Sequence, residues 1–140
     1  MAASRAPTAP AAVILGADTE VVLDGRLLGK PRDTADAARM LRDLRGREHQ
    51  VITGLAVVET GRAGATPETA SVTTWVRMGG YDDAEIDAYV ATGEPLDKAG
   101  GYAVQGLGSR LVAAVDGCFT NVVGLPLTTT STLLARRGLR

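Results

Sequence analysis

A chain of 140 residues with 45% apolar and 22% charged side chains has the length and composition of one globular domain, which excludes a disordered chain. Fifteen basic residues against sixteen acidic ones give a net charge of −1, which excludes the basic field of a nucleic-acid-binding protein. The single cysteine, Cys118, cannot form an internal disulfide, and no run of about 18 apolar residues predicts a membrane span, so we expect a cytoplasmic protein.

The opening of the chain predicts a tail, a strand and a tight turn. Residues 1–10 are rich in Ala and Pro, so we expect a flexible tail ahead of one domain over residues 11–140. The apolar run 11–17 predicts a buried strand that ends at Asp18. Asp24-Gly25 then predicts a hairpin, because this dipeptide accepts the positive φ angles of a tight primed turn.

Strands and helices alternate along the rest of the chain. We expect a helix between Asp33 and Gly46, strands over 50–58 and 71–78, a helix over 83–91 that Asp82 and Glu85 cap, strands over 110–115 and 119–123, and a last helix from Pro126 toward Arg137. This interleaving indicates the α/β class, with a mixed, twisted sheet flanked by helices.

Two polar positions early in the chain are candidates for a binding site. Asp18 follows a buried strand, and ligands of α/β proteins are often met at the carboxyl ends of strands; its alternative role is to form a turn. Lys30 lies between Gly29 and Pro31 on an open loop, where its ammonium group can reach a phosphate. The alternative for Lys30 is an ordinary solvated surface lysine.

The stretch from 93 to 108 gathers further polar candidates. Glu94 and Asp97 offer carboxylates to a divalent metal, with Glu94 the expected ligand, and Lys98 can neutralise phosphate charge. A salt-bridged surface loop is the alternative. Gln105, next to Gly106, can direct its amide at the edge of a base or be an ordinary surface residue. His49 is the only histidine, which excludes a histidine-rich metal site.

Six short motifs occur in order along the chain. They are Leu15-Gly16-Ala17-Asp18-Thr19, Leu28-Gly29-Lys30-Pro31, His49-Gln50-Val51-Ile52-Thr53-Gly54, the loop 93–100, Tyr102-Ala103-Val104-Gln105-Gly106 and Asn121-Val122-Val123-Gly124-Leu125-Pro126-Leu127. In this order and at these intervals they resemble the Maf family of nucleotide pyrophosphatases, which is named for septum formation. The resemblance implies a fold related to that of the inosine-triphosphate pyrophosphatases.

The resemblance also implies a hydrolase of nucleotide metabolism. Family members cleave a nucleoside triphosphate between its α and β phosphates and release the monophosphate and pyrophosphate, a housecleaning activity connected with cell division. The Asp-Lys-Ala-Gly stretch 97–100 and Gln105-Gly106 look like the branch that acts on dTTP and UTP. A Mg²⁺ or Mn²⁺ cofactor and a homodimer are implied too.

Roles for single residues follow from the same resemblance. Asp18 matches the proposed general base, which draws a proton from the attacking water, and is also an expected metal ligand. Thr19 and Gln105 match residues associated with nucleotide choice, and Lys30 and Lys98 match lysines of the phosphate site. Cations of this kind neutralise phosphate charge and keep a neighbouring carboxylate ionised. We therefore expect Asp18, Lys30 and Lys98 to converge on one phosphate-sized cleft.

The resemblance is incomplete ahead of Asp18. Family members have an additional strand, a Ser-x-Ser-Pro-Arg-Arg loop and a helix before this motif, but only seventeen residues precede Asp18 here. We therefore expect a domain that is incomplete at its N-terminus, with little activity in these 140 residues alone. Two alternatives stay open. One is a non-catalytic remnant that binds nucleotide weakly or binds a partner through an exposed sheet edge. The other is an inosine-triphosphate-type pyrophosphatase.

Overall fold

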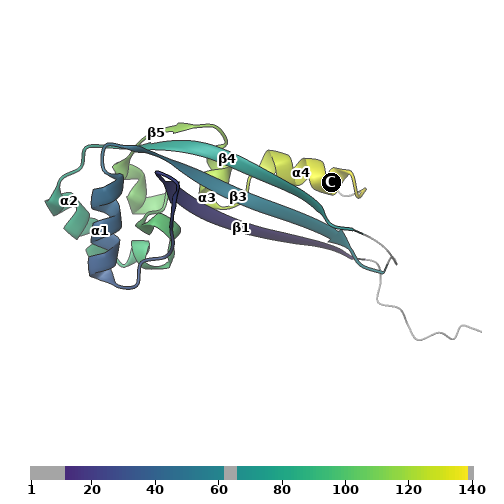
Figure 1. Ribbon diagram of the computed structural model, residues 1–140, viewed down its shortest axis with the longest axis horizontal. Coiled ribbons are helices and arrows are strands. Elements are labelled where there is room, and N and C mark those ends of the chain that lie inside the picture. Colours follow the sequence, from purple (N-terminus) through teal and green to yellow (C-terminus); the bar gives the residue numbers. More distant parts are fainter. Residues whose placement is uncertain (1–11, 62–65, 139–140) are drawn as a thin grey trace, which may run out of the picture.

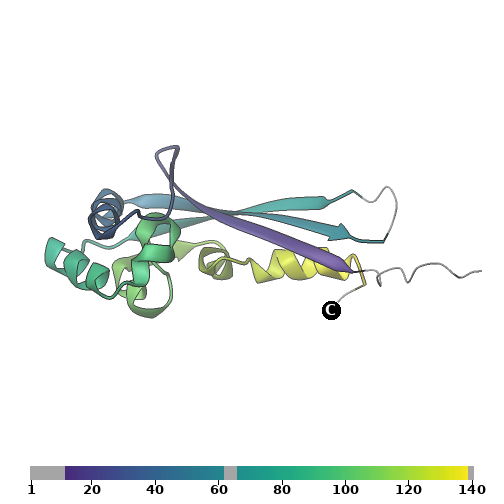
Figure 2. The same cartoon turned by 90° about the horizontal axis from the view of Figure 1, so that it is seen from below.

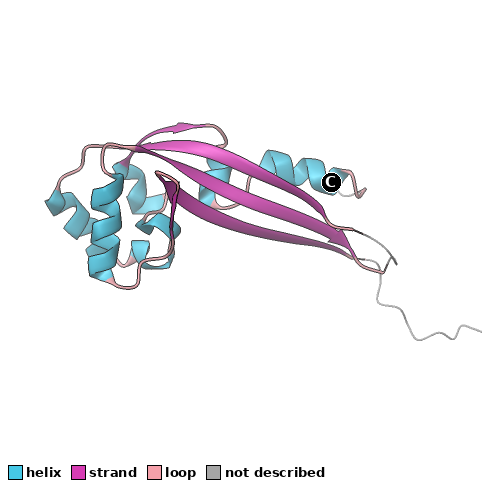
Figure 3. Cartoon of the chain, in the orientation of Figure 1, coloured by secondary structure: helices cyan, strands magenta, loops and turns pink. Residues whose placement is uncertain are grey.

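The computed structural model describes residues 12–61 and 66–138, and these build a five-stranded sheet with helices packed against it (Figure 1). The strands are β1 (Val13–Leu23), β2 (Arg26–Leu28), β3 (Glu48–Glu59), β4 (Glu68–Met78) and β5 (Val112–Asp116), in the spatial order β2-β1-β3-β4-β5. The predicted tail, residues 1–10, lies outside the described residues. Figure 3 shows the three long strands extending beyond a helical end of the molecule.

The predicted α/β class is confirmed, but the strand directions differ from the expected mixed sheet. All four pairings that the structure describes are antiparallel. Parallel neighbours need a connection that returns the chain to the opposite end of the sheet. Here β3 starts opposite the end of β1, with Val22 paired to Gln50, so the connection between these two strands starts and ends on the same side.

Three of the four α-helices in the described residues lie where the sequence predicts a helix. They are α1 (Thr34–Leu44), α2 (Asp83–Ala91), α3 (Phe119–Val123) and α4 (Leu127–Ala135), with short 3₁₀ turns η1 (Glu94–Asp97), η2 (Ala99–Gly101) and η3 (Gly106–Leu111). Asp82 and Glu85 form the predicted capping box of α2. Asp33 accepts a hydrogen bond from the Asp36 amide and caps α1. Asp24 and Gly25 make the predicted hairpin with φ angles of 50° and 78°.

Two predicted elements differ most from the structure. The first strand does not end at Asp18 but continues to Leu23, because Thr19, Val21 and Leu23 keep alternating toward the interior. The predicted strand 119–123 is the helix α3, bounded by Gly117 and Gly124 with φ angles of 123° and 131°. Five residues are too few for periodicity to separate a strand from one helical turn.

The core lies on one face of the sheet. Figure 2 shows α3 and α4 on one side of the long strands. Toward that side β3 presents alternate buried residues, among them Val51, Leu55 and Val57, while the residues between them are partly or fully exposed. A larger apolar cluster joins β1, β3 and β4 to α1 and α2, and a smaller one places Leu133 of α4 against Leu55 and Val57. No described helix has the length and apolar composition that a membrane crossing requires.

Candidate nucleotide-binding site

A cavity of about 210 Å³ lies where β1 and β3 face η1, η2 and α3. Its lining consists of Thr19, Val21, Lys30, Val51, Asp97, Lys98, Ala99, Tyr102, Val122, Val123 and Gly124. Three of the predicted site residues, Thr19, Lys30 and Lys98, are thus brought together from distant parts of the sequence. Lys30 and Lys98 are also the only two lysines of the chain, so both of its compact, mobile ammonium groups line one cavity. We call it the lysine cavity.

Gln105 lines an adjoining cavity of about 180 Å³. The two cavities share Lys98, Tyr102, Val122 and Val123, so Gln105 lies next to the lysine cavity rather than inside it. The Gln105 amide beside the two ammonium groups of the lysine cavity matches the two parts of a nucleotide. The phosphates would lie in the lysine cavity and the base next to Gln105. The predicted separation of roles between the lysines and Gln105 is therefore sterically possible.

The loops that bear the two lysines are joined by their backbones. The Gly100 amide donates a hydrogen bond of 3.1 Å to the carbonyl of Gly29, the residue before Lys30. Gly100 has a φ of 77°, and a Cβ atom there would meet Val21 Cγ1 at 3.0 Å. Glycine is therefore required at this position both by conformation and by the close approach to β1. The bond fixes the separation of the Lys30 and Lys98 backbones.

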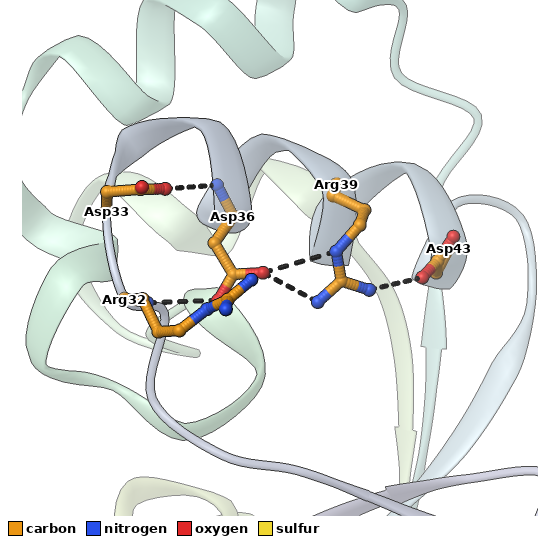
Figure 4. A network of polar contacts seen from close by, with 5 residues as sticks. All are labelled: Arg32, Asp33, Asp36, Arg39 and Asp43. Carbon is orange, nitrogen blue, oxygen red and sulfur yellow. Dashed lines mark hydrogen bonds and ion pairs between the residues drawn. The ribbon is translucent and has the colours of Figure 1, made fainter.

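The loop after Lys30 is held to α1 by a buried carboxylate (Figure 4). Asp36 has 6% of its surface exposed, and its Oδ2 accepts a 2.9 Å hydrogen bond from the backbone amide of Arg32. Its Oδ1 accepts a 2.6 Å bond from the Arg39 guanidinium, which also contacts Asp43. The Arg32 amide, and after it Arg39, lower the pKa of Asp36, so the carboxylate stays charged. This network places Lys30 at the start of a fixed segment.

Tyr102 forms a wall of both cavities and is a residue that sequence analysis did not single out. Its hydroxyl group forms a 2.5 Å hydrogen bond with His49 Nε2, and the two rings meet edge to face. Burial lowers the pKa of His49 to about 4, so the imidazole is neutral at physiological pH. The signal in the sequence was the position of Tyr102 in the same motif as Gln105.

Thr19 connects three elements at the base of the lysine cavity. Its Oγ1 lies 2.8 Å from Thr53 Oγ1 on β3 and donates a 3.3 Å bond to the carbonyl of Gly124, just after α3. Asn121 of α3 is fully buried, and its Nδ2 donates to the carbonyls of Val51 and Val72. These bonds hold α3 against the sheet and so position Val122 and Val123 in the lining of the lysine cavity.

Asp18 is not brought into the lysine cavity. Consecutive strand residues point to opposite faces, so Thr19 directs its side chain toward the cavity and Asp18 directs its side chain away from it. Asp18 pairs with Gly54 of β3 and lines a broad, shallow depression together with Gly16 and Ser71. The expected convergence of Asp18, Lys30 and Lys98 is therefore found only for the two lysines. With the strand predicted to end at Asp18, the face on which this side chain lies could not be derived from the sequence.

Glu94 uses its carboxylate for hydrogen bonds within the protein. Oε1 accepts from the Tyr89 hydroxyl at 2.8 Å and from the Gly108 amide at 3.0 Å, and Oε2 accepts from the Leu107 amide at 3.3 Å. Burial acts to raise the pKa of Glu94, but these bonds and nearby Lys98 lower it below its ordinary value.

The described residues do not by themselves form a metal site. Residues 12–61 and 66–138 contain no group of three His, Cys, Asp or Glu side chains that could hold an ion together. Asp97 is the carboxylate that lines the lysine cavity, and it lies 3.4 Å from Lys98. Mg²⁺ commonly binds proteins through one or two carboxylates plus the phosphates of a substrate, so the residues present fit only an ion that arrives with a phosphate ligand.

Known proteins match this chain over nearly its whole length. The family model described as Maf-like protein matches residues 1–137. The dTTP/UTP pyrophosphatase of Anaeromyxobacter dehalogenans (strain 2CP-C) is 52% identical over 138 residues, which are 99% of this chain and 71% of that protein. The dTTP/UTP pyrophosphatases of Dictyoglomus turgidum and Gloeobacter violaceus are 51% and 54% identical over 127 residues, which are 91% of this chain and 65% of each relative. The chain belongs to the Maf family.

Proposed function

We propose that this protein is a nucleoside triphosphate pyrophosphatase that hydrolyses dTTP and UTP to their monophosphates and pyrophosphate. The observation that carries the proposal is the meeting of Lys30 and Lys98 in one cavity with Gln105 in the adjoining one. The relatives named above, which bear the name dTTP/UTP pyrophosphatase, support it. A housecleaning role in nucleotide metabolism fits this activity.

The two lysines supply charge neutralisation in the proposed reaction. The oxygen of a water molecule forms a bond to the α phosphorus and gives up a proton to a base. The bond from that phosphorus to the oxygen that bridges to the β phosphate breaks, and pyrophosphate leaves with the electron pair. Negative charge grows on the departing phosphates, and fixed ammonium groups stabilise it without having to reorganise. Lys30 and Lys98, on two loops that the Gly100–Gly29 bond joins, are placed for this purpose.

The remaining parts of the proposal concern the base, the metal and the assembly. The family resemblance implies Asp18 as the general base, although its side chain lies on the face of the sheet away from the lysine cavity. If Asp18 is the base, Asp18→Asn abolishes turnover while nucleotide binding persists; unchanged turnover would assign proton removal to another residue. Mg²⁺ or Mn²⁺ is proposed to enter with the triphosphate, in keeping with the single carboxylate Asp97 at the lysine cavity. We also propose a cytoplasmic homodimer, as the family resemblance implies.

Pyrophosphate release from a panel of triphosphates tests the proposal. The chain spans 71% of the Anaeromyxobacter relative, so turnover is measured for residues 1–140 and for the same residues preceded by the N-terminal segment of that relative. With Mg²⁺ present, dTTP and UTP should give monophosphate and pyrophosphate faster than ITP, GTP or dATP. Binding of UTP without turnover in either form would show a nucleotide-binding protein instead of an enzyme. Preference for ITP would assign the inosine-triphosphate type.

A further inference from the structure

We propose that Glu94, together with Tyr89, is a positioning residue that fixes Gln105 beside the lysine cavity. The inference rests on the proposed function, because it assigns Gln105 to the base of a bound nucleotide. It gives Glu94 a role different from the metal ligand that the sequence suggests. Four hydrogen bonds carry it, and none of them involves Gln105 itself.

Glu94 holds the chain on the C-terminal side of Gln105. Its two carboxylate oxygens accept hydrogen bonds from the backbone amides of Leu107 and Gly108, at 3.3 and 3.0 Å. These amides belong to the first turn of η3. Gly106, between them and Gln105, has a φ of 69°, and a Cβ atom there would lie 3.0 Å from Glu94 Oε2. The carboxylate therefore lies directly against this backbone.

Tyr89 of α2 holds the chain on the other side of Gln105. Its hydroxyl donates a 2.8 Å hydrogen bond to Glu94 Oε1 and accepts a 3.0 Å bond from the Ala103 amide. A Cβ atom on Gly108 would lie 2.6 Å from this hydroxyl and 2.2 Å from the Ala103 carbonyl, so the two sides of the loop touch at this point. The Glu94–Tyr89 pair thus fixes residues 103 and 107–108, which bracket Gln105.

Gln105 is exposed while its neighbours are held. Val104 is buried in the main core cluster with 6% of its surface exposed, and Tyr102 is bonded to His49. The side chain of Gln105 therefore projects from a backbone that is fixed at every flanking point, into the cavity that shares Lys98 with the lysine cavity. Fixing a recognition group in advance lowers the entropy lost when a ligand binds.

The chemistry of the site requires an ionised carboxylate. Glu94 receives three donors and has only acceptor atoms, so every contact is favourable. An amide in its place would direct an NH₂ group at one or more of these donors and would lose the charge that strengthens the bonds. Glu94→Gln therefore keeps the size of the side chain and removes the property that holds the loop.

The test compares two ligands in three proteins. Binding of UTP and of inorganic tripolyphosphate, both with Mg²⁺, is measured by calorimetry for the wild type, Glu94→Gln and the control Asp87→Asn. Asp87 is an exposed carboxylate on the same helix as Tyr89. Glu94→Gln should weaken UTP binding about tenfold, the effect of one lost charge-assisted hydrogen bond, and leave tripolyphosphate binding unchanged or tighter. Asp87→Asn should change neither.

A second single variant and a double variant test whether Glu94 acts through Gln105. Tyr89→Phe should weaken UTP binding in the same sense as Glu94→Gln, and both variants should speed hydrogen exchange at the Leu107 and Gly108 amides. In a Gln105→Ala background, Glu94→Gln should cause no further loss of UTP affinity. Additive losses, or an unchanged affinity for UTP in Glu94→Gln, overturn the inference.

Two other outcomes are told apart by the same data. A larger Mg²⁺ requirement for tripolyphosphate binding in Glu94→Gln would mean that Glu94 is a metal ligand, and would overturn the positioning role. Equal loss of both ligands would do so as well, because it would show general loss of structure. If the wild type binds neither UTP nor tripolyphosphate, the proposed function fails. If Glu94→Gln leaves hydrogen exchange at the Leu107 and Gly108 amides unchanged, only the positioning role of Glu94 is refuted.

Discussion

At the scale of single residues, His49 and Tyr102 join the core to the candidate site. His49 has 1% of its surface exposed, and its Nδ1 atom has no hydrogen-bond partner among the described residues. Its Nε2 atom is bonded to the Tyr102 hydroxyl, and the Tyr102 ring lines both cavities. Protonation of this imidazole would put an uncompensated charge in the core, which is why burial lowers its pKa to about 4.

The pH dependence of stability follows from this shift. The pKa of His49 is 6.5 in the unfolded chain and about 4 in the folded chain. The contribution of neutral His49 to the free energy of unfolding is therefore complete above pH 6.5 and is lost as the pH falls toward 4. Between pH 7 and pH 5 the free energy of unfolding should fall by about 2 kcal/mol through His49. Urea unfolding at pH 7 and pH 5 measures this difference in the free energy of unfolding. His49→Gln should lack this contribution, and an identical pH dependence in both proteins would contradict the account.

Asn121 is the second residue whose burial defines the site. It is fully buried, and its Nδ2 lies within 3.1 Å of the Val51 and Val72 carbonyls and the Thr74 hydroxyl. Asn121→Ala leaves these acceptors unpaired beside a cavity, so we expect about 2–4 kcal/mol of lost stability by chemical unfolding. Thr73→Ala, an exposed change on β4, should cost about 0.5 kcal/mol or less. Similar losses for both variants would argue against this role.

At the scale of elements, the decisive contact is between the two loops that present the lysines. Gly100→Ala places a side chain in left-handed backbone and against Val21, which should cost about 1–2 kcal/mol. The strain would displace the Gly100 amide, which donates to the Gly29 carbonyl, and so loosen the contact between the two lysine loops. The substitution should therefore weaken tripolyphosphate binding as well. Gly80→Ala is the matched control, since nothing lies within 4 Å of its Cβ position and its φ is ordinary. Equal binding by the two variants would show that the loops are not coupled.

The elements also show what the sequence could and could not predict. Capping residues and turn dipeptides act locally, so the α2 capping box and the Asp24-Gly25 hairpin were predictable. The type of α3 was not, because it depends on contacts of Asn121 with strands about 50 to 70 residues away in the sequence. The meeting of Lys30 and Lys98 was expected from the family resemblance. The face that Asp18 occupies was not, because it depends on the strand continuing to Leu23.

At the scale of the whole molecule, the site lies where the helical end meets the long strands. The core clusters are on one face of the sheet, and residues of β1, β3, η1, η2 and α3 line the lysine cavity. Asp18 lies on the other face, beside the depression formed with Gly16, Gly54 and Ser71. The cationic and acidic parts predicted for one cleft are therefore separated by the thickness of the sheet.

The central claim is that the lysine cavity binds the phosphates of the nucleotide. Calorimetry with inorganic tripolyphosphate and Mg²⁺ measures this directly in the wild type, Lys30→Ala, Lys98→Ala and the control Arg42→Ala, an exposed basic residue on α1. Removing either lysine should weaken binding about tenfold or more, since each is a charged contact to phosphate. Arg42→Ala should bind within about twofold of the wild type. If both lysine variants bind tripolyphosphate as the wild type does, the phosphates lie elsewhere and the account is wrong.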